Sequence, residues 1–164
     1  MKVRSEVSAL SDVKENAVAV FIFEDKNGLA QQIAALGMQL GEKLQAAISL
    51  KDFTAKEGEL LSLYTEKPIA SPRHFHVGAG ETDKGTLEKL RRASATAAKT
   101  AQSMKIGSLG IEFPPLTLLP HLIGSSTADV AQAIVEGAFL SVYKYDKYIT
   151  PGNENKRLES LTLF

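Results

Sequence analysis

The sequence predicts an α/β protein, a three-layer α/β/α sandwich around a mixed, largely parallel β-sheet. The first observation is the unbroken apolar run Ala17–Phe23. Both of its alternating faces are apolar, as in a strand that helices cover on both sides. The second is the order along the chain of strand-like runs and segments with helical spacing, which favours crossover connections and a layered architecture.

The N-terminal half is expected to contain four strands and two short helices. Lys2–Ser8 is mostly polar, which suits a strand near the edge of the sheet or one with a face open to water. The apolar residues from Leu29 to Ile48 have helical spacing, but Gly37 and Gly41 interrupt them, so two helices are expected rather than one. The strands are expected at Lys2–Ser8, Ala17–Phe23, Glu59–Thr65 and Arg73–Val77.

The C-terminal half is expected to contain two helices and two strands. The first helix runs from about residue 83 to Ser103, with Asp83 or Thr86 as its N-cap. The second begins at the capping-box pattern Ser126–Asp129 and continues an apolar face to Val142. The strands are expected at Ile106–Phe113, before a proline-rich loop that Gly124 closes, and at Arg157–Phe164, after a polar turn at Gly152–Asn155.

Length and composition limit the function classes. Residues 1–164 are expected to form a single domain, because a chain of this length can bury a core of its own. Lysine plus arginine and aspartate plus glutamate both number 19, so nucleic acid is not an expected partner. Cysteine is absent, which excludes disulfides and thiolate zinc sites. With no signal-peptide core and no membrane-spanning run, a cytoplasmic protein without membrane contact is expected.

Gly78, Ala79 and Gly80 form a candidate anion-binding loop. They lie between a predicted strand and a predicted helix, where backbone N–H groups can cradle a phosphate and the helix dipole favours it. The full dinucleotide pattern would need glycine at position 83, where Asp83 stands, and no G-K-[ST] triplet occurs. A tight strand-to-helix turn that binds no ligand is the competing interpretation.

His74 and His76 alternate on a predicted strand, so they share one face and could ligate a metal with a third group. The competing interpretation is a polar pair on a sheet face that a helix covers, because no third convergent ligand is evident. His121 lies in the proline-rich loop. Arg91 and Arg92 are interpreted as part of a solvated helix face. G-x-S-x-G and H-E-x-x-H are absent, so no catalytic residue is assigned.

Three short motifs follow one another along the chain: Phe53–Glu59, Val77–Gly80 and Glu136–Tyr148. They read F-T-A-K-E-G-E, V-G-A-G and E-G-A-F-L-S-V-Y-K-Y-D-K-Y. They resemble the patterns F-x-G-K-x-G-E, V-G-L-G and E-G-x-x-L-x-x-Y-x-F/Y-D-x-Y in the N-terminal domain of the leucyl (cytosol) aminopeptidase family. The helix that carries Arg91 and Ala93 also fits. Ala55 stands where the family pattern has glycine.

This resemblance implies a macro-domain-like fold and a longer parent enzyme. The family's peptidase site, with two divalent metals (zinc or manganese), belongs to a separate C-terminal domain, whose signature N-T-D-A-E-G-R is absent here. No catalytic residue or metal ligand is therefore carried over, and this chain alone is not expected to hydrolyse peptides.

Two functions remain open. The first is a noncatalytic N-terminal domain with an architectural role, in contact with the parent's catalytic domain and with neighbouring subunits of a homo-hexamer. The alternative is a stand-alone macro-like module that binds ADP-ribose or another phosphate ligand at Gly78–Gly80. Fold analogy alone does not decide between them.

Overall fold

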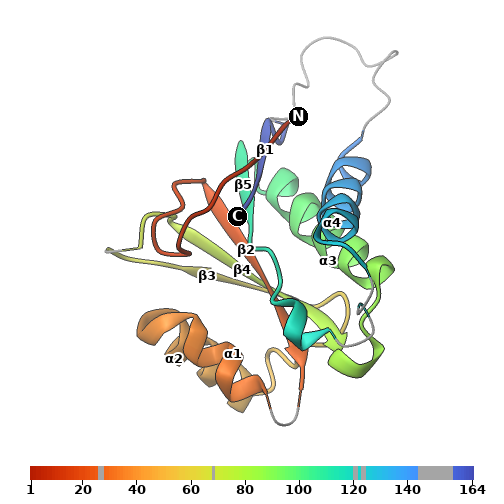
Figure 1. Cartoon of the computed structure of the whole chain (residues 1–164). Helices are drawn as coiled ribbons and strands as arrows, with labels where there is room; N and C mark the ends of the chain where they lie inside the picture. Colours follow the sequence, from red (N-terminus) through yellow and green to blue (C-terminus); the bar gives the residue numbers. More distant parts are fainter. Residues whose placement is uncertain (26–27, 68, 120–121, 123–124, 144–156) are drawn as a thin grey trace.

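One sheet lies between two layers of helices (Figure 1). The computed structural model describes residues 1–25, 28–67, 69–119, 122, 125–143 and 157–164. The strands are β1 (Lys2–Ser5), β2 (Ala17–Glu24), β3 (Leu60–Tyr64), β4 (Arg73–Glu81), β5 (Ser108–Ile111) and β6 (Ser160–Leu163). The helices are α1 (Leu29–Ala35), α2 (Gly37–Ser49), α3 (Leu87–Ser103) and α4 (Thr127–Ser141), with short 3₁₀ turns η1 (Thr82–Lys84) and η2 (Leu116–Leu118).

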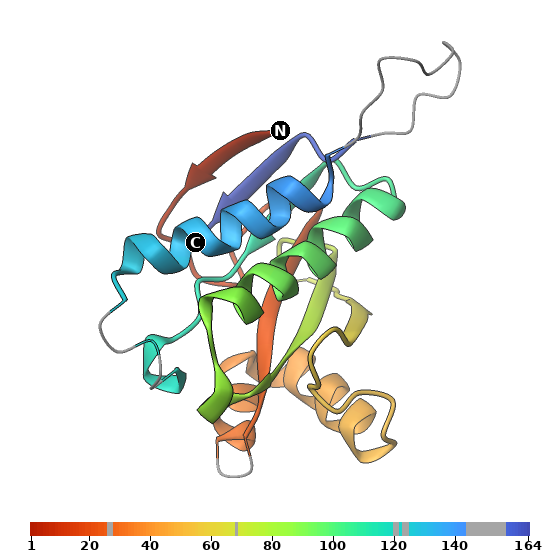
Figure 2. The same ribbon diagram turned by 90° about the vertical axis from the view of Figure 1, so that its right-hand side faces the viewer.

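The described residues contribute six strands to the sheet, in the order β1-β6-β5-β2-β4-β3. Neighbouring strands are parallel except β3 and β4, which are antiparallel. The pair α1 and α2 covers one face and the pair α3 and α4 covers the other; Figure 2 shows α3 and α4 side by side across the sheet. The predicted α/β class and the mixed, largely parallel sheet are confirmed.

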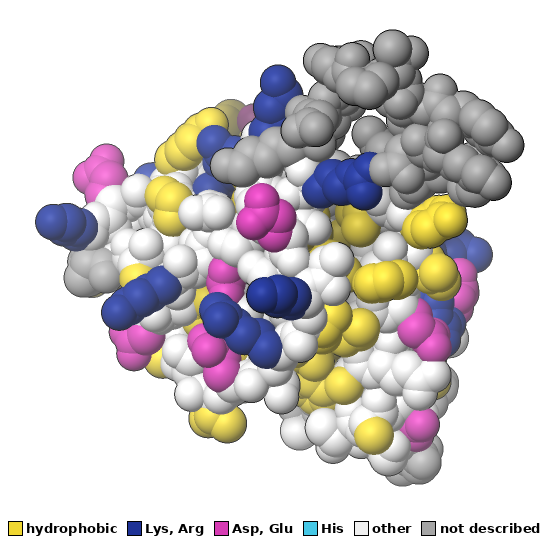
Figure 3. Space-filling model, turned by 90° about the horizontal axis from the view of Figure 1, so that it is seen from above, with side chains coloured by type: hydrophobic (Ala, Val, Ile, Leu, Met, Phe, Trp, Pro, Cys, Tyr) yellow, Lys and Arg dark blue, Asp and Glu magenta, His cyan; other side chains and the backbone are white. Residues whose placement is uncertain are grey.

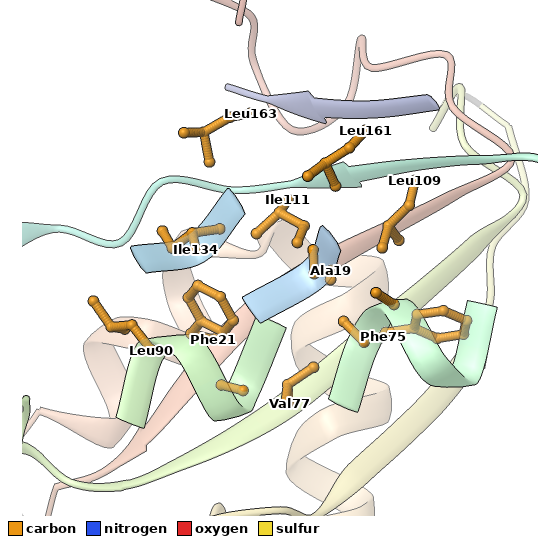
Figure 4. Close-up of a cluster of buried hydrophobic side chains, with 14 of the residues drawn as sticks. Ala19, Phe21, Phe75, Val77, Leu90, Leu109, Ile111, Ile134, Leu161 and Leu163 are labelled. Atoms are coloured by element: carbon orange, nitrogen blue, oxygen red, sulfur yellow. The ribbon is translucent and has the colours of Figure 1, made fainter. Parts of the chain in front are cut away.

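β2 lies in the middle of the sheet, between β5 and β4. Its residues from Ala17 to Phe23 are at most 5% exposed. Val18 and Val20 belong to the apolar cluster beneath α1 and α2, whereas Ala19 and Phe21 face α3 and α4 (Figure 4). Both faces of this strand are therefore buried, as its sequence predicts.

α3 and α4 begin at capping residues that the sequence indicates. The Thr86 hydroxyl accepts a hydrogen bond from the Lys89 N–H (3.2 Å), so Thr86 rather than Asp83 caps α3. Ser126 and Asp129 form the predicted capping box of α4, with reciprocal hydrogen bonds of 2.8 and 3.1 Å. These contacts satisfy N–H groups that have no partner within a helix.

The predicted break between two short helices is confirmed at Leu36, between α1 and α2. Gly37 follows with a φ of 77°, in the left-handed region that glycine adopts without a steric penalty. The chain can therefore turn there, and α2 then packs Leu40 and Leu44, both at most 1% exposed, on the sheet.

β1 is the exposed edge strand that the sequence predicts, and it pairs with β6. Arg4 ties it to the interior, because its Nε donates to Thr162 Oγ1 (2.8 Å) and its Nη2 to Glu15 Oε1 (2.6 Å). Burial alone would raise the pKa of Glu15, but hydrogen bonds from Ser108, Thr162 and Arg4 outweigh it and lower this pKa. An ionised Glu15 thus links β1, β6 and the segment before β2.

β4 is longer than predicted. The prediction that this strand ends at Val77, with a turn at Gly78–Gly80, is wrong, because the strand continues to Glu81. Its extra residues pair with the end of β2 on one side, and the loop before β3 accepts hydrogen bonds from Gly78 and Gly80 on the other. Gly80 has a φ of 74°, at the point where the register of the pairing shifts. β1, β5 and β6 are shorter than predicted. The predictions for His121, Gly124, Gly152–Asn155 and the end of the Glu136–Tyr148 motif fall outside the described residues.

Candidate functional site

The candidate anion-binding segment packs against the loop Phe53–Glu59. The N–H of Gly78 donates to the Glu59 carbonyl oxygen (2.9 Å), and the N–H of Gly80 donates to the Ala55 carbonyl oxygen (3.0 Å). Two of the three sequence motifs are therefore in direct contact, and two of the three candidate amides already have carbonyl partners. The expected open strand-to-helix loop is wrong, since these residues form buried strand. Anion binding here stays a prediction without geometric support.

Close approach of the backbone explains why this contact uses glycine. A Cβ built on Gly78 would overlap the Lys56 carbonyl oxygen and lie 2.7 Å from the Ala55 carbonyl carbon. Ala55 itself has a φ of 61°, a conformation that glycine adopts more easily. The Glu59 carboxylate stabilises the loop, because it accepts hydrogen bonds from the Thr54 N–H (2.7 Å) and the Thr54 hydroxyl (2.8 Å). Both motifs thus have an architectural explanation.

Doubly wound sheets bind ligands outside the carboxyl ends of their strands, at the point where the strand order reverses. Here β4 lies on one side of β2 and the next strand in the chain, β5, lies on the other, so the reversal falls between the carboxyl ends of β2 and β5. Glu24 and Asp25 follow β2, and Glu112 follows β5. Burial raises the pKa of Glu112. The α4 N-terminus already holds the carboxylate of Asp129. These acidic groups disfavour a phosphate ligand.

The third motif meets α3. Glu136 on α4 pairs with Arg91 on α3 at 3.0 Å. Next to it, a Cβ built on Gly137 would overlap the Arg91 carbonyl oxygen and lie 2.7 Å from the Arg91 carbonyl carbon. Arg92 pairs with Glu57 (3.0 Å) and so joins α3 to the Phe53–Glu59 loop. Arg91 and Arg92 are therefore both paired with carboxylates within the domain.

Charges of both signs are mixed on the face of the molecule that Figure 3 presents. Figure 3 shows lysine and arginine side chains interspersed with aspartate and glutamate on the face it presents. A nucleic-acid-binding surface concentrates basic residues on one face or stripe. The surface on this side of the molecule therefore agrees with the balanced composition.

His74 and His76 are each 0% exposed on β4. The strand register places His74 opposite Val18 and His76 opposite Val20, so both imidazoles face the α1 and α2 layer, as the covered-face interpretation predicts. Their ring nitrogens have no hydrogen-bond partner among the described residues. Burial lowers the pKa of His74 to about 4; burial, and next the charge of His74, lowers that of His76 to about 3.

A metal site at these histidines gains no support. Within the described part of the chain, no group of three or more His, Cys, Asp or Glu residues could hold a metal ion. Two neutral imidazoles surrounded by apolar side chains lack the convergent ligands that zinc uses. The pair is instead a buried polar feature of the core.

Gln32 on α1 is a buried polar residue that sequence reasoning missed. Its Oε1 accepts from the Phe23 N–H (2.8 Å), and its Nε2 donates to the Phe23 carbonyl oxygen (3.1 Å). The pairing of β2 with β4 shifts between Ile22 and Phe23, and the side-chain amide satisfies the backbone there. The sequence signal that could have identified it is a polar residue within a segment whose apolar residues have helical spacing.

Comparison with known proteins assigns the chain to a family. It matches the N-terminal domain of the cytosol aminopeptidase family over residues 17–151. The chain belongs to this family. It is 31% identical over 154 residues to a probable cytosol aminopeptidase of Oleidesulfovibrio alaskensis, covering 94% of this chain and 29% of that protein. The Aquifex aeolicus relative is 30% identical, with 95% and 29% covered. The chain thus spans less than a third of these cytosol aminopeptidases.

Solved structures support the same fold. Tomato leucine aminopeptidase (a K354E mutant) aligns with a TM-score of 0.70 and 21% identity, covering 99% of this chain and 32% of that chain. The macrodomain of Mycobacterium tuberculosis DarG aligns with a TM-score of 0.64 and 11% identity, covering 98% and 96%. The macro-domain-like fold that the aminopeptidase motifs implied is confirmed.

Proposed function

We propose that this chain is the noncatalytic N-terminal domain of a metal-dependent leucyl aminopeptidase that removes N-terminal residues from peptides. The observation that carries the proposal is the family match over residues 17–151 together with relatives more than three times as long. The domain's own role is architectural: its motifs hold a loop, a strand and a helix pair together. It contacts the parent's catalytic domain and neighbouring subunits of a homo-hexamer.

The metal chemistry is proposed for the parent's other domain. A two-metal site needs several carboxylates that converge, and the described residues hold no group that could bind even one ion. Zinc or manganese therefore does not fit the residues that the structure describes. One solved relative in fold, the bottromycin maturation enzyme BotP, is described in complex with Mn.

We propose a cytoplasmic location. Its support is the name of the relatives, which are probable cytosol aminopeptidases. Among the described residues, no helix is long and apolar enough to cross a bilayer.

An activity assay tests the noncatalytic role. The chain is incubated with a chromogenic leucyl substrate and either manganese or zinc, beside the full-length Aquifex aeolicus relative as a positive control. The relative is expected to release the chromophore, and the chain is expected to release none above a protein-free blank. Metal-dependent turnover by the chain alone would refute the proposal.

Sedimentation tests the oligomer role. The same relative is compared with a variant that lacks the segment aligned with this chain. Loss of the hexamer in the truncated variant, with folding verified by circular dichroism, is the expected result. A truncated variant that still forms the intact hexamer would show that the domain does not organise the assembly.

The alternative is binding of ADP-ribose or another phosphate ligand by a macro-like module. The macrodomain similarity supports the fold alone, and the carboxylates near the crevice argue against a diphosphate. Calorimetric titration with ADP-ribose is therefore expected to show no saturable heat in the micromolar range. Saturable binding that Glu112→Gln strengthens would instead favour the alternative.

A further inference from the structure

We propose that a polar pocket at the end of the sheet where β2 and β4 begin binds a small oxyanion, a carboxylate or a phosphate group. This pocket, the Arg73 pocket, has a volume of about 270 Å³. It lies at the ends of elements far apart in sequence: Tyr64 ends β3, Arg73 begins β4, Asn16 precedes β2 and Lys105 follows α3. It is separate from the crevice at the carboxyl ends of the strands.

Neutral groups hold the Arg73 guanidinium in place. Its carbon lies 4.9 Å from the centroid of the Tyr64 ring. Nη2 donates to the Tyr64 hydroxyl (3.2 Å), and Nη1 donates to the Met104 sulfur (3.5 Å). Because neither partner is charged, these contacts orient the guanidinium without neutralising it. Its remaining N–H groups stay available to an anion.

Two further donors line the same pocket. The Lys105 side chain is exposed, and no ion pair among the described residues involves Lys105 or Arg73. The Ser108 hydroxyl oxygen accepts from the Asn16 backbone N–H (2.9 Å) and so holds Asn16 beside the pocket. The NH₂ group of the Asn16 side chain is a hydrogen-bond donor.

The donor set defines the ligand class. Arginine, lysine and an amide NH₂ all donate hydrogen bonds, and among the described residues no aspartate or glutamate lines the pocket. An arginine fork matches the oxygens of carboxylate and phosphate, and lysine adds a point charge. The side chains around the pocket therefore suit an anion with two or more oxygens and disfavour a cation.

Titration calorimetry with sodium phosphate and with succinate, at an ionic strength fixed with sodium chloride, tests the proposal and separates the two sources of oxyanion. At least one of the two is expected to bind saturably. Arg73→Gln and Lys105→Gln are each expected to weaken that binding about tenfold, as loss of a charged hydrogen bond implies.

Lys51→Gln is the matched control. Like Lys105, Lys51 follows a helix with a positive φ, but it does not line the pocket. It should leave the affinity unchanged. Absence of saturable heat with both anions, or equal weakening by Lys51→Gln and Lys105→Gln, would overturn the proposal. If Arg73→Gln fails to fold, the comparison of the two lysine variants decides.

Discussion

At the C-terminal ends of α2 and α3, a single lysine takes the left-handed backbone conformation that ends the helix. Lys51 and Lys105 have φ values of 63° and 58°. At α2 the Asp52 N–H donates to the Ala47 carbonyl (2.9 Å) and the Lys51 N–H to the Ile48 carbonyl (3.0 Å), the paired bonds of a Schellman motif. The N-caps were predictable because serine and threonine side chains make the capping bond. The Schellman endings were not predictable, because glycine is the usual signal of this motif and lysine stands at that position in both helices.

Replacing Lys51 by glycine should stabilise the domain. The exposed lysine takes a left-handed conformation that crowds its Cβ, whereas glycine adopts it without that cost, so the free energy of unfolding should rise by about 0.5–1 kcal/mol. Urea denaturation followed by circular dichroism measures the change. Lys51→Ala removes the same charge but keeps the Cβ, and it should give no comparable gain. Equal gains from both variants would point to the charge instead.

At the level of helices and strands, local signals predicted the order of elements, and distant contacts decided the rest. The apolar run of β2 and the caps of α3 and α4 depend on neighbouring residues, so the sequence shows them. Gly78 and Gly80 are typical of a turn, yet they lie within β4 because the Phe53–Glu59 loop, distant in sequence, supplies their carbonyl partners. The order of strands in the sheet depends on such contacts too.

The contact between α3 and α4 sets helix propensity against steric overlap at Gly137. The sign of the change in stability on substitution by alanine shows which effect is larger. Helix propensity alone would make Gly137→Ala stabilising by roughly 1 kcal/mol. The new Cβ would, however, overlap the Arg91 backbone, so the helices must move apart, and we expect a net destabilisation of about 1–3 kcal/mol. Chemical denaturation monitored at the helical signal measures the change.

Glu136→Ala separates this packing from the ion pair beside it. It removes the contact with Arg91 but leaves the close approach at Gly137 intact. Because both side chains are partly exposed, at 34% and 37%, solvent screens the pair, and its loss should destabilise the domain much less than Gly137→Ala does. A Gly137→Ala variant more stable than the wild-type domain would show that α3 and α4 can separate without cost.

Across the whole molecule, the two faces of the sheet carry cores of different character. The face under α3 and α4 carries a large apolar cluster that includes Phe21, Phe75 and Ile134 (Figure 4). The face under α1 and α2 includes the unpartnered imidazoles of His74 and His76. The sequence predicted that the two histidines share a covered face. It could not show that their ring nitrogens lack partners, because that depends on how distant parts of the chain pack against them.

These histidines should make the domain sensitive to mild acid. In the unfolded chain both take up protons near the ordinary pKa of 6.5, whereas in the folded state burial lowers these pKa values to about 4 and about 3. Keeping the rings neutral therefore costs nothing above pH 6.5. As the pH falls from 6.5 toward 4, only the unfolded state gains protons, and the free energy of unfolding falls by up to about 1.4 kcal/mol per pH unit for each histidine.

Urea denaturation at several pH values between 7.5 and 5 tests this, a window above the ordinary pKa of glutamate. Burial raises the pKa of Glu112, and its protonation acts in the opposite direction, because the folded state takes up that proton first. The wild-type midpoint should drop steadily below pH 6.5, and the double variant His74→Leu/His76→Leu should flatten that slope, because leucine cannot take up a proton. His121→Ala is the control for the remaining histidine and should leave the slope in place. A wild-type midpoint that stays constant down to pH 5 would contradict the prediction, since it would mean that the folded core accepts these protons as readily as the unfolded chain does.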